Sequence, residues 1–306
     1  MLVILCPGQG AQKPGFMNSW LELPEYRESI ESMAATIDID LIKHGSISDE
    51  ETIRDTAIAQ PLIVSASIAT AKLLDLSKVH GVAGHSVGEV SAAQIAGILN
   101  QEQAIQLVNL RAKSMAKAAA ESEKTSMAAV LGGEVETVLS RLVELNLTPA
   151  NYNGAGQIVA AGAADSIQKL VAEGPQGSKV IPLSVAGAFH TQYMFPAVST
   201  LSEFVATLEV NDPNKSIWSN QSGQLVSKGS EFLNLLVGQV ASSVRWDLCM
   251  EAMLAAGVTS VIEVSPAGTL SGLAKRGMPG VEIVALKEPK DLEVAQDLIS
   301  RTNEGK

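Results

Sequence analysis

Short β-branched runs alternate with helical segments along this chain, and that alternation predicts an α/β fold. The largest expected part has strands at 2–6, 79–83, 216–219, 260–263 and 281–285. Helices are expected at 19–36, 56–76, 90–99, 101–119, 194–208, 230–239 and 247–256. No internal repeat or low-complexity tract interrupts this order.

The middle of the chain has a different order of predicted strands and helices. Strands are expected at 127–131, 150–153, 158–162 and 179–185, with helices at 134–145 and 164–173. The resulting order β-α-β-β-α-β is that of a ferredoxin-like unit. We therefore predict a small domain at 125–190, inserted into a large domain formed by 1–124 and 191–306.

Composition narrows the class of protein. The chain has 306 residues, of which 46% are hydrophobic and 18% charged, so it can bury a sizeable core and disorder is excluded. The net charge of −11 argues against a nucleic-acid binder with a basic stripe. Cys6 and Cys249 are too far apart in sequence to suggest a zinc site or a disulfide framework. No apolar run approaches a membrane span, and the run at 2–6 is too short for a signal peptide, so we expect a cytoplasmic protein.

The segment Gly84-His85-Ser86-Val87-Gly88 lies between an expected strand and an expected helix. This is the context of a G-x-S-x-G nucleophile elbow, in which a tight turn exposes the serine and the helix N-terminus faces a developing oxyanion. Ser86 is therefore a candidate nucleophile. The alternative is a tight turn in which Ser86 only caps the helix.

A catalytic serine needs a base, and the chain has four histidines: His44, His80, His85 and His190. His85 is held inside the elbow, and His190, which ends an expected strand, is the best candidate. The one aspartate between Ser86 and His190 is Asp165, on an expected helix of the small domain. An α/β-hydrolase triad fits this layout badly, and a serine–histidine dyad fits it better.

Arg111 lies in the middle of the apolar face of the expected helix 101–119. A buried guanidinium needs an anionic partner, which is either an internal carboxylate or the carboxylate of a substrate. The glycine- and glutamine-rich loop 8–13 matches neither the dinucleotide fingerprint nor the Walker pattern. Such a loop after a parallel strand could instead supply a second oxyanion N–H beside the elbow.

Together these residues resemble the malonyl-CoA:acyl carrier protein transacylase family, which includes the acyltransferase domains of polyketide synthases. The matching motifs occur in family order at 7–12, 56–61, 84–89, 110–115, 150–162, 188–191, 243–246 and 264–276. The family fold is an α/β-hydrolase-like large domain with an inserted ferredoxin-like small domain, as in the segment order above.

The resemblance implies a role for each site residue. Ser86 is the nucleophile and His190 the base. Arg111 pairs with the malonyl carboxylate, and the N–H groups of Gln9 and Val87 form the oxyanion hole. The backbone carbonyl of Gln239 orients the histidine, which explains the missing aspartate.

The implied reaction is ping-pong transfer of malonyl from malonyl-CoA to the phosphopantetheine thiol of acyl carrier protein, in fatty acid synthesis, without a metal or redox cofactor. We expect the enzyme to act as a monomer. The tetrad 187–190 reads G-A-F-H and keeps the phenylalanine of the H-A-F-H tetrad that malonyl-selective polyketide acyltransferases often carry. Its first residue departs from that pattern. Val87 also resembles the malonyl type.

Other functions stay open at this point. They are a malonyl transferase of a malonate decarboxylase or a polyketide pathway, a serine thioesterase or esterase, and a silent module that binds carrier protein. A buried cation argues against an esterase for neutral acyl chains. An acidic carrier protein would need a local basic patch on this acidic chain, for which the candidates are Lys113, Lys117, Lys275 and Arg276.

Overall fold

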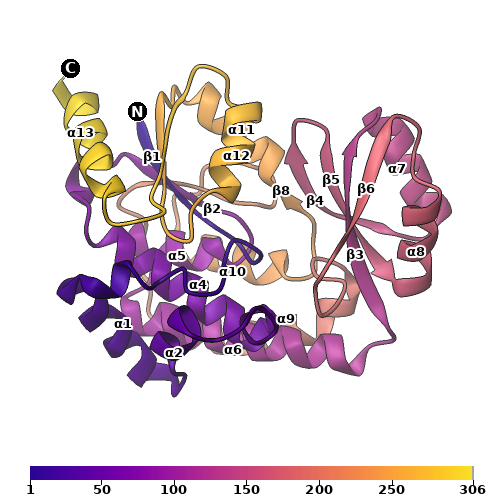
Figure 1. Cartoon of the computed structure of the whole chain (residues 1–306), viewed down its shortest axis with the longest axis horizontal. Helices are drawn as coiled ribbons and strands as arrows, with labels where there is room; N and C mark the ends of the chain where they lie inside the picture. Colours follow the sequence, from indigo (N-terminus) through magenta and orange to yellow (C-terminus); the bar gives the residue numbers. More distant parts are fainter. Residues whose placement is uncertain (305–306) are drawn as a thin grey trace.

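The computed structural model describes residues 1–304 and contains two five-stranded sheets (Figure 1). The sheet of the predicted large domain is parallel throughout. Its strands lie in the order β10 (Glu282–Ala285), β9 (Ser260–Glu263), β1 (Leu2–Cys6), β2 (Gly81–Gly84) and β7 (Ser216–Trp218). β1 is buried along its whole length, which is why its sequence is an unbroken apolar run.

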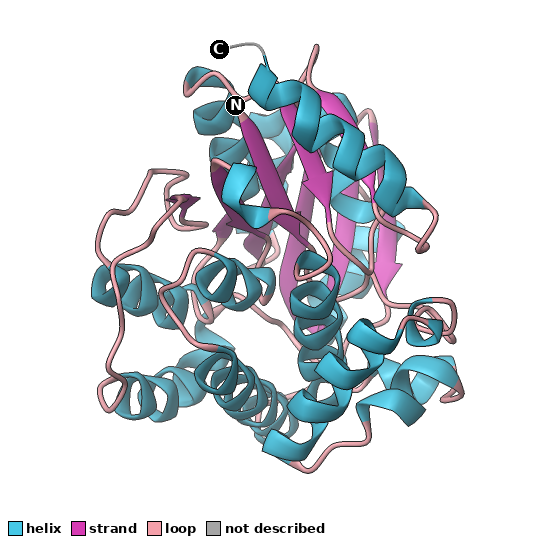
Figure 2. Cartoon of the chain, turned by 90° about the vertical axis from the view of Figure 1, so that its left-hand side faces the viewer, coloured by secondary structure: helices cyan, strands magenta, loops and turns pink. Residues whose placement is uncertain are grey.

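Helices pack on both faces of this sheet (Figure 2). Leu2, Ile4 and Cys6 of β1 belong to the core on one face, whereas Val3 and Leu5 belong to the core on the other, as the alternation of a strand requires. The first face carries α1 (Pro24–Ile37), α2 (Leu41–Ser46), α3 (Glu50–Arg54), α4 (Thr56–Ala71), α5 (Gly88–Ile95), α6 (Gln101–Glu121), α9 (Phe195–Val205), α10 (Gly229–Gln239) and α13 (Asp291–Glu304). The second carries α11 (Trp246–Ala255) and α12 (Thr269–Gly277).

The second sheet stands apart from the first at the right of Figure 1. Its strands lie in the order β6 (Ser178–Leu183), β3 (Thr125–Gly132), β5 (Gln157–Ala163), β4 (Thr148–Gly154) and β8 (Val244–Arg245). A separate core joins it to α7 (Val135–Glu144) and α8 (Ala164–Ala172). The element order is the ferredoxin-like order, and the predicted fold class is confirmed.

One strand of the small sheet comes from outside 125–190. β8 follows α10 and pairs in parallel with β4, so that Arg245 lies opposite Tyr152. The Arg245 guanidinium stands 4.5 Å from the centre of the Tyr152 ring and also binds Asp247. A strand of two residues has no periodicity that a sequence could reveal, and it ties the inserted segment to the rest of the chain.

Several expected elements differ in the structure. The expected helix 19–36 is divided into a 3₁₀ turn (Trp20–Glu22) and α1, because Pro24 begins a new helix and Leu23 before it is extended. The expected helix 56–76 ends at Ala71. The helices α2, α3, α12 and α13 were not expected at all. Within residues 1–304, no helix combines the length and the apolar character needed to cross a membrane.

Candidate active site

The turn that carries Ser86 is compact because two glycines allow backbones to touch. A Cβ at Gly84 would lie 2.1 Å from the carbonyl carbon of Gly88, and a Cβ at Gly88 would lie 2.2 Å from the carbonyl oxygen of Cys6. Between them Ser86 has a left-handed backbone with φ of 53°, which is rare for a residue with a side chain. The glycines thus bring the first turn of α5 against the end of β1 and raise Ser86 above the sheet.

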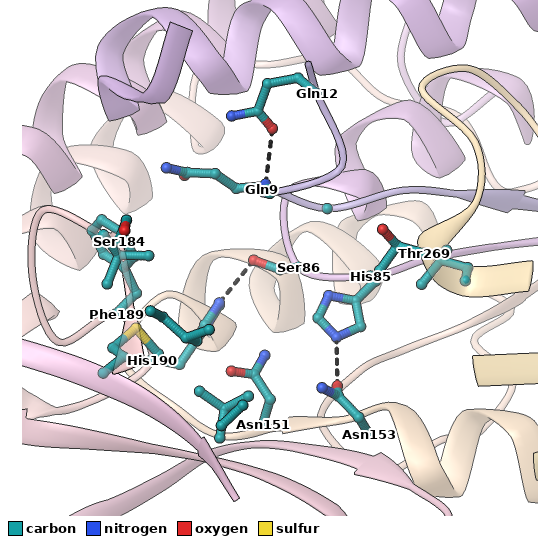
Figure 3. A pocket seen from close by; sticks show the side chains of 18 of the residues that line it. Gln9, Gln12, His85, Ser86, Asn151, Asn153, Ser184, Phe189, His190 and Thr269 are labelled. Carbon is teal, nitrogen blue, oxygen red and sulfur yellow. Dashed lines mark hydrogen bonds between the residues drawn. The ribbon is translucent and has the colours of Figure 1, made fainter. Parts of the chain in front are cut away.

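Ser86, His190 and Gln239 form one hydrogen-bonded chain. The Ser86 hydroxyl lies 2.7 Å from Nε2 of His190, and Nδ1 of His190 lies 2.8 Å from the backbone oxygen of Gln239 (Figure 3 shows the first contact). A carbonyl only accepts, so Nδ1 carries the proton and Nε2 is left to accept from the hydroxyl. This is the geometry of a serine with a general base whose orienting group is a neutral carbonyl.

His190 is held in its neutral form. Burial lowers the pKa of His190 to about 3, and the nearby Arg111 charge acts in the same direction, while the bond to the Gln239 carbonyl opposes them. The imidazole is therefore free to take a proton from Ser86 at neutral pH.

Two backbone N–H groups beside Ser86 have no acceptor among the described residues. They belong to Gln9, in the loop after β1, and to Val87, directly after the serine. Gly8 keeps that loop against the elbow, because a Cβ there would lie 2.8 Å from the His85 carbonyl oxygen. The two strand ends thus bring both N–H groups to the elbow, where donors of an oxyanion hole would be required.

Arg111 is 1% exposed and has amides as partners. Nη1 donates to Oε1 of Gln60 at 2.7 Å, and Nη2 donates to Oε1 of Gln239 at 2.9 Å and to the Ser86 hydroxyl at 3.4 Å. It has no ion pair with a carboxylate of the described chain within 4.0 Å. Nε has no partner there either. Burial lowers the pKa of Arg111 to about 10, opposed by Glu89, so the group stays cationic at neutral pH.

A cavity of about 270 Å³ opens in front of Ser86 and His190. It lies between the domains, because Asn151 and Asn153 of β4 line it together with the elbow and with Leu273 of α12 (Figure 3). His85 bridges the two sides, with Nε2 2.9 Å from Oδ1 of Asn153. Burial lowers the pKa of His85. No group of three or more side chains suited to hold a metal ion occurs in the part of the chain that the structure describes.

The structure brings together all six residues that the sequence singled out: Ser86, His190, Arg111, Gln9, Val87 and Gln239. Sequence reasoning did not assign the supporting residues Gln60, Glu89 and Asn220. Gln60 and Glu89 lie within motifs that were noticed, T-A-I-A-Q-P and G-H-S-V-G-E, but a buried amide or carboxylate has no periodicity signal. Asn220, which accepts from the Ser86 N–H at 2.7 Å, gave no signal.

Residues 3–295 match the family model described as the acyl transferase domain. A malonyl CoA-acyl carrier protein transacylase of Mycobacterium bovis is 43% identical, with 97% of this chain and all of that protein covered. One of Bacillus subtilis is 31% identical, with 99% and 98% covered.

Solved structures agree with these matches. The crystal structure of MCAT from Mycobacterium tuberculosis has a TM-score of 0.92 at 42% identity, covering 97% of this chain and 99% of that one. A malonyl-transacylase in complex with its type II PKS acyl-carrier protein has a TM-score of 0.90 at 26% identity, with 97% and 99% covered.

Replacing Gly88 by alanine should destabilise the protein by about 3 kcal/mol or more, because the new methyl group meets the Cys6 carbonyl, which is backbone and cannot move aside. Urea unfolding followed by circular dichroism measures the change. Gly238→Ala is the matched control, since a Cβ at this helical position meets nothing within 4 Å, and it should be neutral or stabilising. Equal losses for both variants would contradict the close approach at the elbow.

The low pKa of His190 predicts an unusual pH profile for the reactivity of Ser86. A histidine with an ordinary pKa near 6.5 is mostly protonated at pH 5.5 and would lose about tenfold in rate between pH 7.5 and 5.5. His190 stays neutral over this range, because its pKa is lowered to about 3. Labelling of Ser86 by a serine-directed organophosphonate, measured by intact-protein mass, should therefore change less than about twofold. A tenfold fall at pH 5.5, with the fold intact by circular dichroism, would contradict this assignment.

Proposed function

The chain belongs to the acyl transferase domain family, and from that premise we propose that it transfers malonyl groups from malonyl-CoA to acyl carrier protein in fatty acid synthesis. The proposal assigns 1–124 and 191–306 to the catalytic domain and 125–190 to the inserted one. It is supported by the relatives of 43% and 31% identity named as malonyl CoA-acyl carrier protein transacylases.

The observation that carries the choice of acyl group is Arg111. Its Nη2 lies 3.4 Å from the attacking hydroxyl of Ser86. Its partners are amide and hydroxyl oxygens, which stabilise a guanidinium without neutralising its charge. Three of the five guanidinium N–H groups are used in this way, and Nε with one Nη1 hydrogen remains for another acceptor. In a malonyl thioester, a carboxylate lies one methylene group away from the reacting carbonyl carbon, and this carboxylate is such an acceptor.

In the first half-reaction, the Ser86 oxygen attacks the thioester carbonyl carbon while His190 Nε2 takes the hydroxyl proton. The carbonyl oxygen becomes an oxyanion held by the N–H groups of Gln9 and Val87, each worth about 3–4 kcal/mol in comparable sites. The tetrahedral intermediate then expels the CoA thiolate, which receives the proton from His190. Malonyl remains on Ser86 as an ester.

In the second half-reaction, the phosphopantetheine thiol of the carrier protein gives its proton to His190 and attacks the ester carbonyl. The same two N–H groups hold the oxyanion. Ser86 leaves, takes the proton back, and the carrier departs with a malonyl thioester. Nucleophile, base, donors and cation are all protein groups, so the proposed transfer proceeds without a metal or redox cofactor.

The alternatives differ in acceptor or in acyl group. A malonyl transferase of a malonate decarboxylase or of a polyketide pathway would share this chemistry and change only the acceptor. A thioesterase or esterase for neutral acyl chains is disfavoured, because an uncharged chain would leave the buried Arg111 charge without an anionic partner. We place the enzyme in the cytoplasm, consistent with Cys6 and Cys249 being free and buried.

Arg111→Ala should lose at least about tenfold of the malonyl transfer rate and gain transfer of acetyl, since a charge-assisted contact is replaced by a neutral space. Intact-protein mass after malonyl-CoA or acetyl-CoA, in separate reactions, measures the acylated fraction over time.

Ser86→Ala is the control in the same assay, and it should take up neither group while remaining folded. A wild-type protein that is not acylated by malonyl-CoA would overturn the proposed function. Equal losses for both acyl donors in Arg111→Ala would instead make Arg111 a structural cation.

Of the candidate basic residues for binding the carrier protein, the pair at the end of α12 has the most suitable position. Lys275 and Arg276 are exposed in its last turn, and Nη2 of Arg276 reaches Oε1 of Gln157, which lines the cavity, at 3.4 Å. Of the other candidates, Lys113 is exposed on α6 and Lys117 is partly balanced by Glu121 at 3.8 Å. The α12 pair therefore stands nearer the rim where a phosphopantetheine arm must enter.

The variant Lys275→Glu/Arg276→Glu should raise the KM for acyl carrier protein several-fold, because an acidic carrier then meets like charge. Malonylation of Ser86 by malonyl-CoA should stay nearly unchanged. Lys113→Glu/Lys117→Glu makes the same charge change on α6 and should affect transfer to the carrier less. A larger effect from the α6 pair would move the docking patch to that helix, and a fall in both half-reactions would assign the α12 pair to CoA or to the fold.

A further inference from the structure

Glu89 is a buried carboxylate that the mechanism above does not use. It lies on the first turn of α5, three residues after Ser86, and is 0% exposed. Like Arg111, it makes no ion pair within 4.0 Å in the described part of the chain. Both of its oxygens are bound by protein N–H groups, so neither is free to bind a substrate. Burying a carboxylate this close to a nucleophile costs desolvation free energy, which the groups that bind the carboxylate must offset.

Both oxygens of Glu89 accept from N–H groups. Oε1 accepts from the backbone N–H of Asn220 at 2.7 Å, and Oε2 accepts from Nε2 of Gln239. Burial raises the pKa of Glu89 to about 8, although the Asn220 N–H, the Arg111 charge and Gln239 each act to lower it. Neither oxygen faces an acceptor among the described residues, which is the pattern of an ionised carboxylate.

The two residues that Glu89 binds, Asn220 and Gln239, also bind the backbone of Ser86, one at its N–H and the other at its carbonyl. Asn220 accepts from the Ser86 N–H at 2.7 Å and donates to the Gly84 carbonyl at 2.7 Å, so it braces the turn. The Gln239 amide donates through Nε2 to Glu89, to the Ser86 carbonyl at 3.1 Å and to Oδ1 of Asn220 at 3.2 Å, and presents Oε1 to Arg111 at 2.9 Å. The carboxylate on one side and the guanidinium on the other allow this amide one orientation only.

We propose that Glu89 is a positioning residue for acyl selection, which acts through the side chain of Gln239 to hold Arg111 toward the acyl group on Ser86. The inference rests on the proposed malonyl transfer and adds a residue to it. Because an amide has one donor end and one acceptor end, Glu89, together with the Ser86 carbonyl and Asn220 Oδ1, holds the NH₂ end of Gln239 and turns its oxygen toward the guanidinium. Arg111 is thereby fixed without being neutralised.

Glu89→Gln tests this link with almost no change in volume. If the oxygen of the new glutamine keeps the Asn220 N–H, its NH₂ group faces the NH₂ of Gln239, and two donors oppose each other. Gln239 must then either shift away from residue 89 or turn over. Turning over sets its oxygen against the Ser86 carbonyl and Asn220 Oδ1 and its NH₂ group against Arg111. Either movement displaces the acceptor that held Nη2. If the new glutamine turns over instead, its NH₂ opposes the Asn220 N–H. Either arrangement leaves a donor without an acceptor.

The readout is the ratio of the rates at which malonyl-CoA and acetyl-CoA acylate Ser86, measured by intact-protein mass. Glu89→Gln should lower this ratio about tenfold toward that of Arg111→Ala, as expected when one charge-assisted contact is misplaced. The rate with acetyl-CoA should fall much less than the rate with malonyl-CoA. A role in folding alone would reduce both rates together and leave the ratio unchanged, and that result overturns the inference.

Glu263→Gln is the matched control. Glu263 is also 0% exposed and accepts only N–H groups, from Gly268, Leu270 and Ser271 at the start of α12, with no connection to Gln239. Its substitution should leave the ratio unchanged, and a shift as large as that of Glu89→Gln would mean that any buried glutamate alters selectivity, contrary to the proposal.

Thermal unfolding establishes which variants are folded. Should Glu89→Gln not fold, Gln239→Met removes the same amide and keeps the backbone carbonyl that binds His190. It should also lower the ratio about tenfold, and an unchanged ratio overturns the inference. If wild-type protein takes up malonyl and Arg111→Ala loses the preference while Glu89→Gln and Gln239→Met keep it, the inference alone fails. If wild-type protein is not malonylated, the proposed function fails first.

Discussion

The site depends on the contact between the first turn of α5 and the end of β1. With hydrogen alone on the α-carbon of Gly88, the helix approaches the Cys6 carbonyl more closely than any side chain would permit. That approach fixes the left-handed turn at Ser86, sets the Val87 N–H beside the serine and places Glu89 inside the protein. His190, Gln239 and Asn220 come from distant parts of the chain, and each binds a group whose place this contact has already determined.

The inserted segment completes the site from the other side. His190 is its last residue, and Asn153 of β4 binds His85 of the elbow. The pairing of β4 with β8 and the contact of Arg245 with Tyr152 hold the small sheet to the segment between α10 and α11. Since Gln239 ends α10, the group that orients the histidine and the strand that anchors the small sheet lie only a few residues apart. These contacts hold together the elements on both sides of the cavity between the domains.

The sequence was most informative where one physical requirement fixed the residue type. The glycines at 84 and 88 revealed the elbow, the unbroken apolar run of β1 revealed a central parallel strand, and the β-α-β-β-α-β order revealed the second domain. It was least informative where tertiary contacts decide. The two residues of β8 form a strand only because β4 is beside them. Short helices such as α2 and α3 gave too few turns for a period to be seen. Glu89 and Gln60 look unremarkable until the structure places them against Arg111 and its partners.

Arg111 links acyl recognition to the strength of the base. An internal carboxylate bound directly to the guanidinium would have neutralised it, whereas amide oxygens from Gln60 and Gln239 satisfy its N–H groups and preserve its charge. That charge is one reason why the pKa of His190 is low, so the uncomplexed enzyme contains a weak base. In the proposed reaction, the carboxylate of a malonyl group would offset the Arg111 charge and its effect on His190, so the base would become stronger when that substrate is bound. A neutral acyl group would leave the Arg111 charge unpaired and the pKa of His190 low. This one buried charge would then favour malonyl both by direct contact and through its effect on His190.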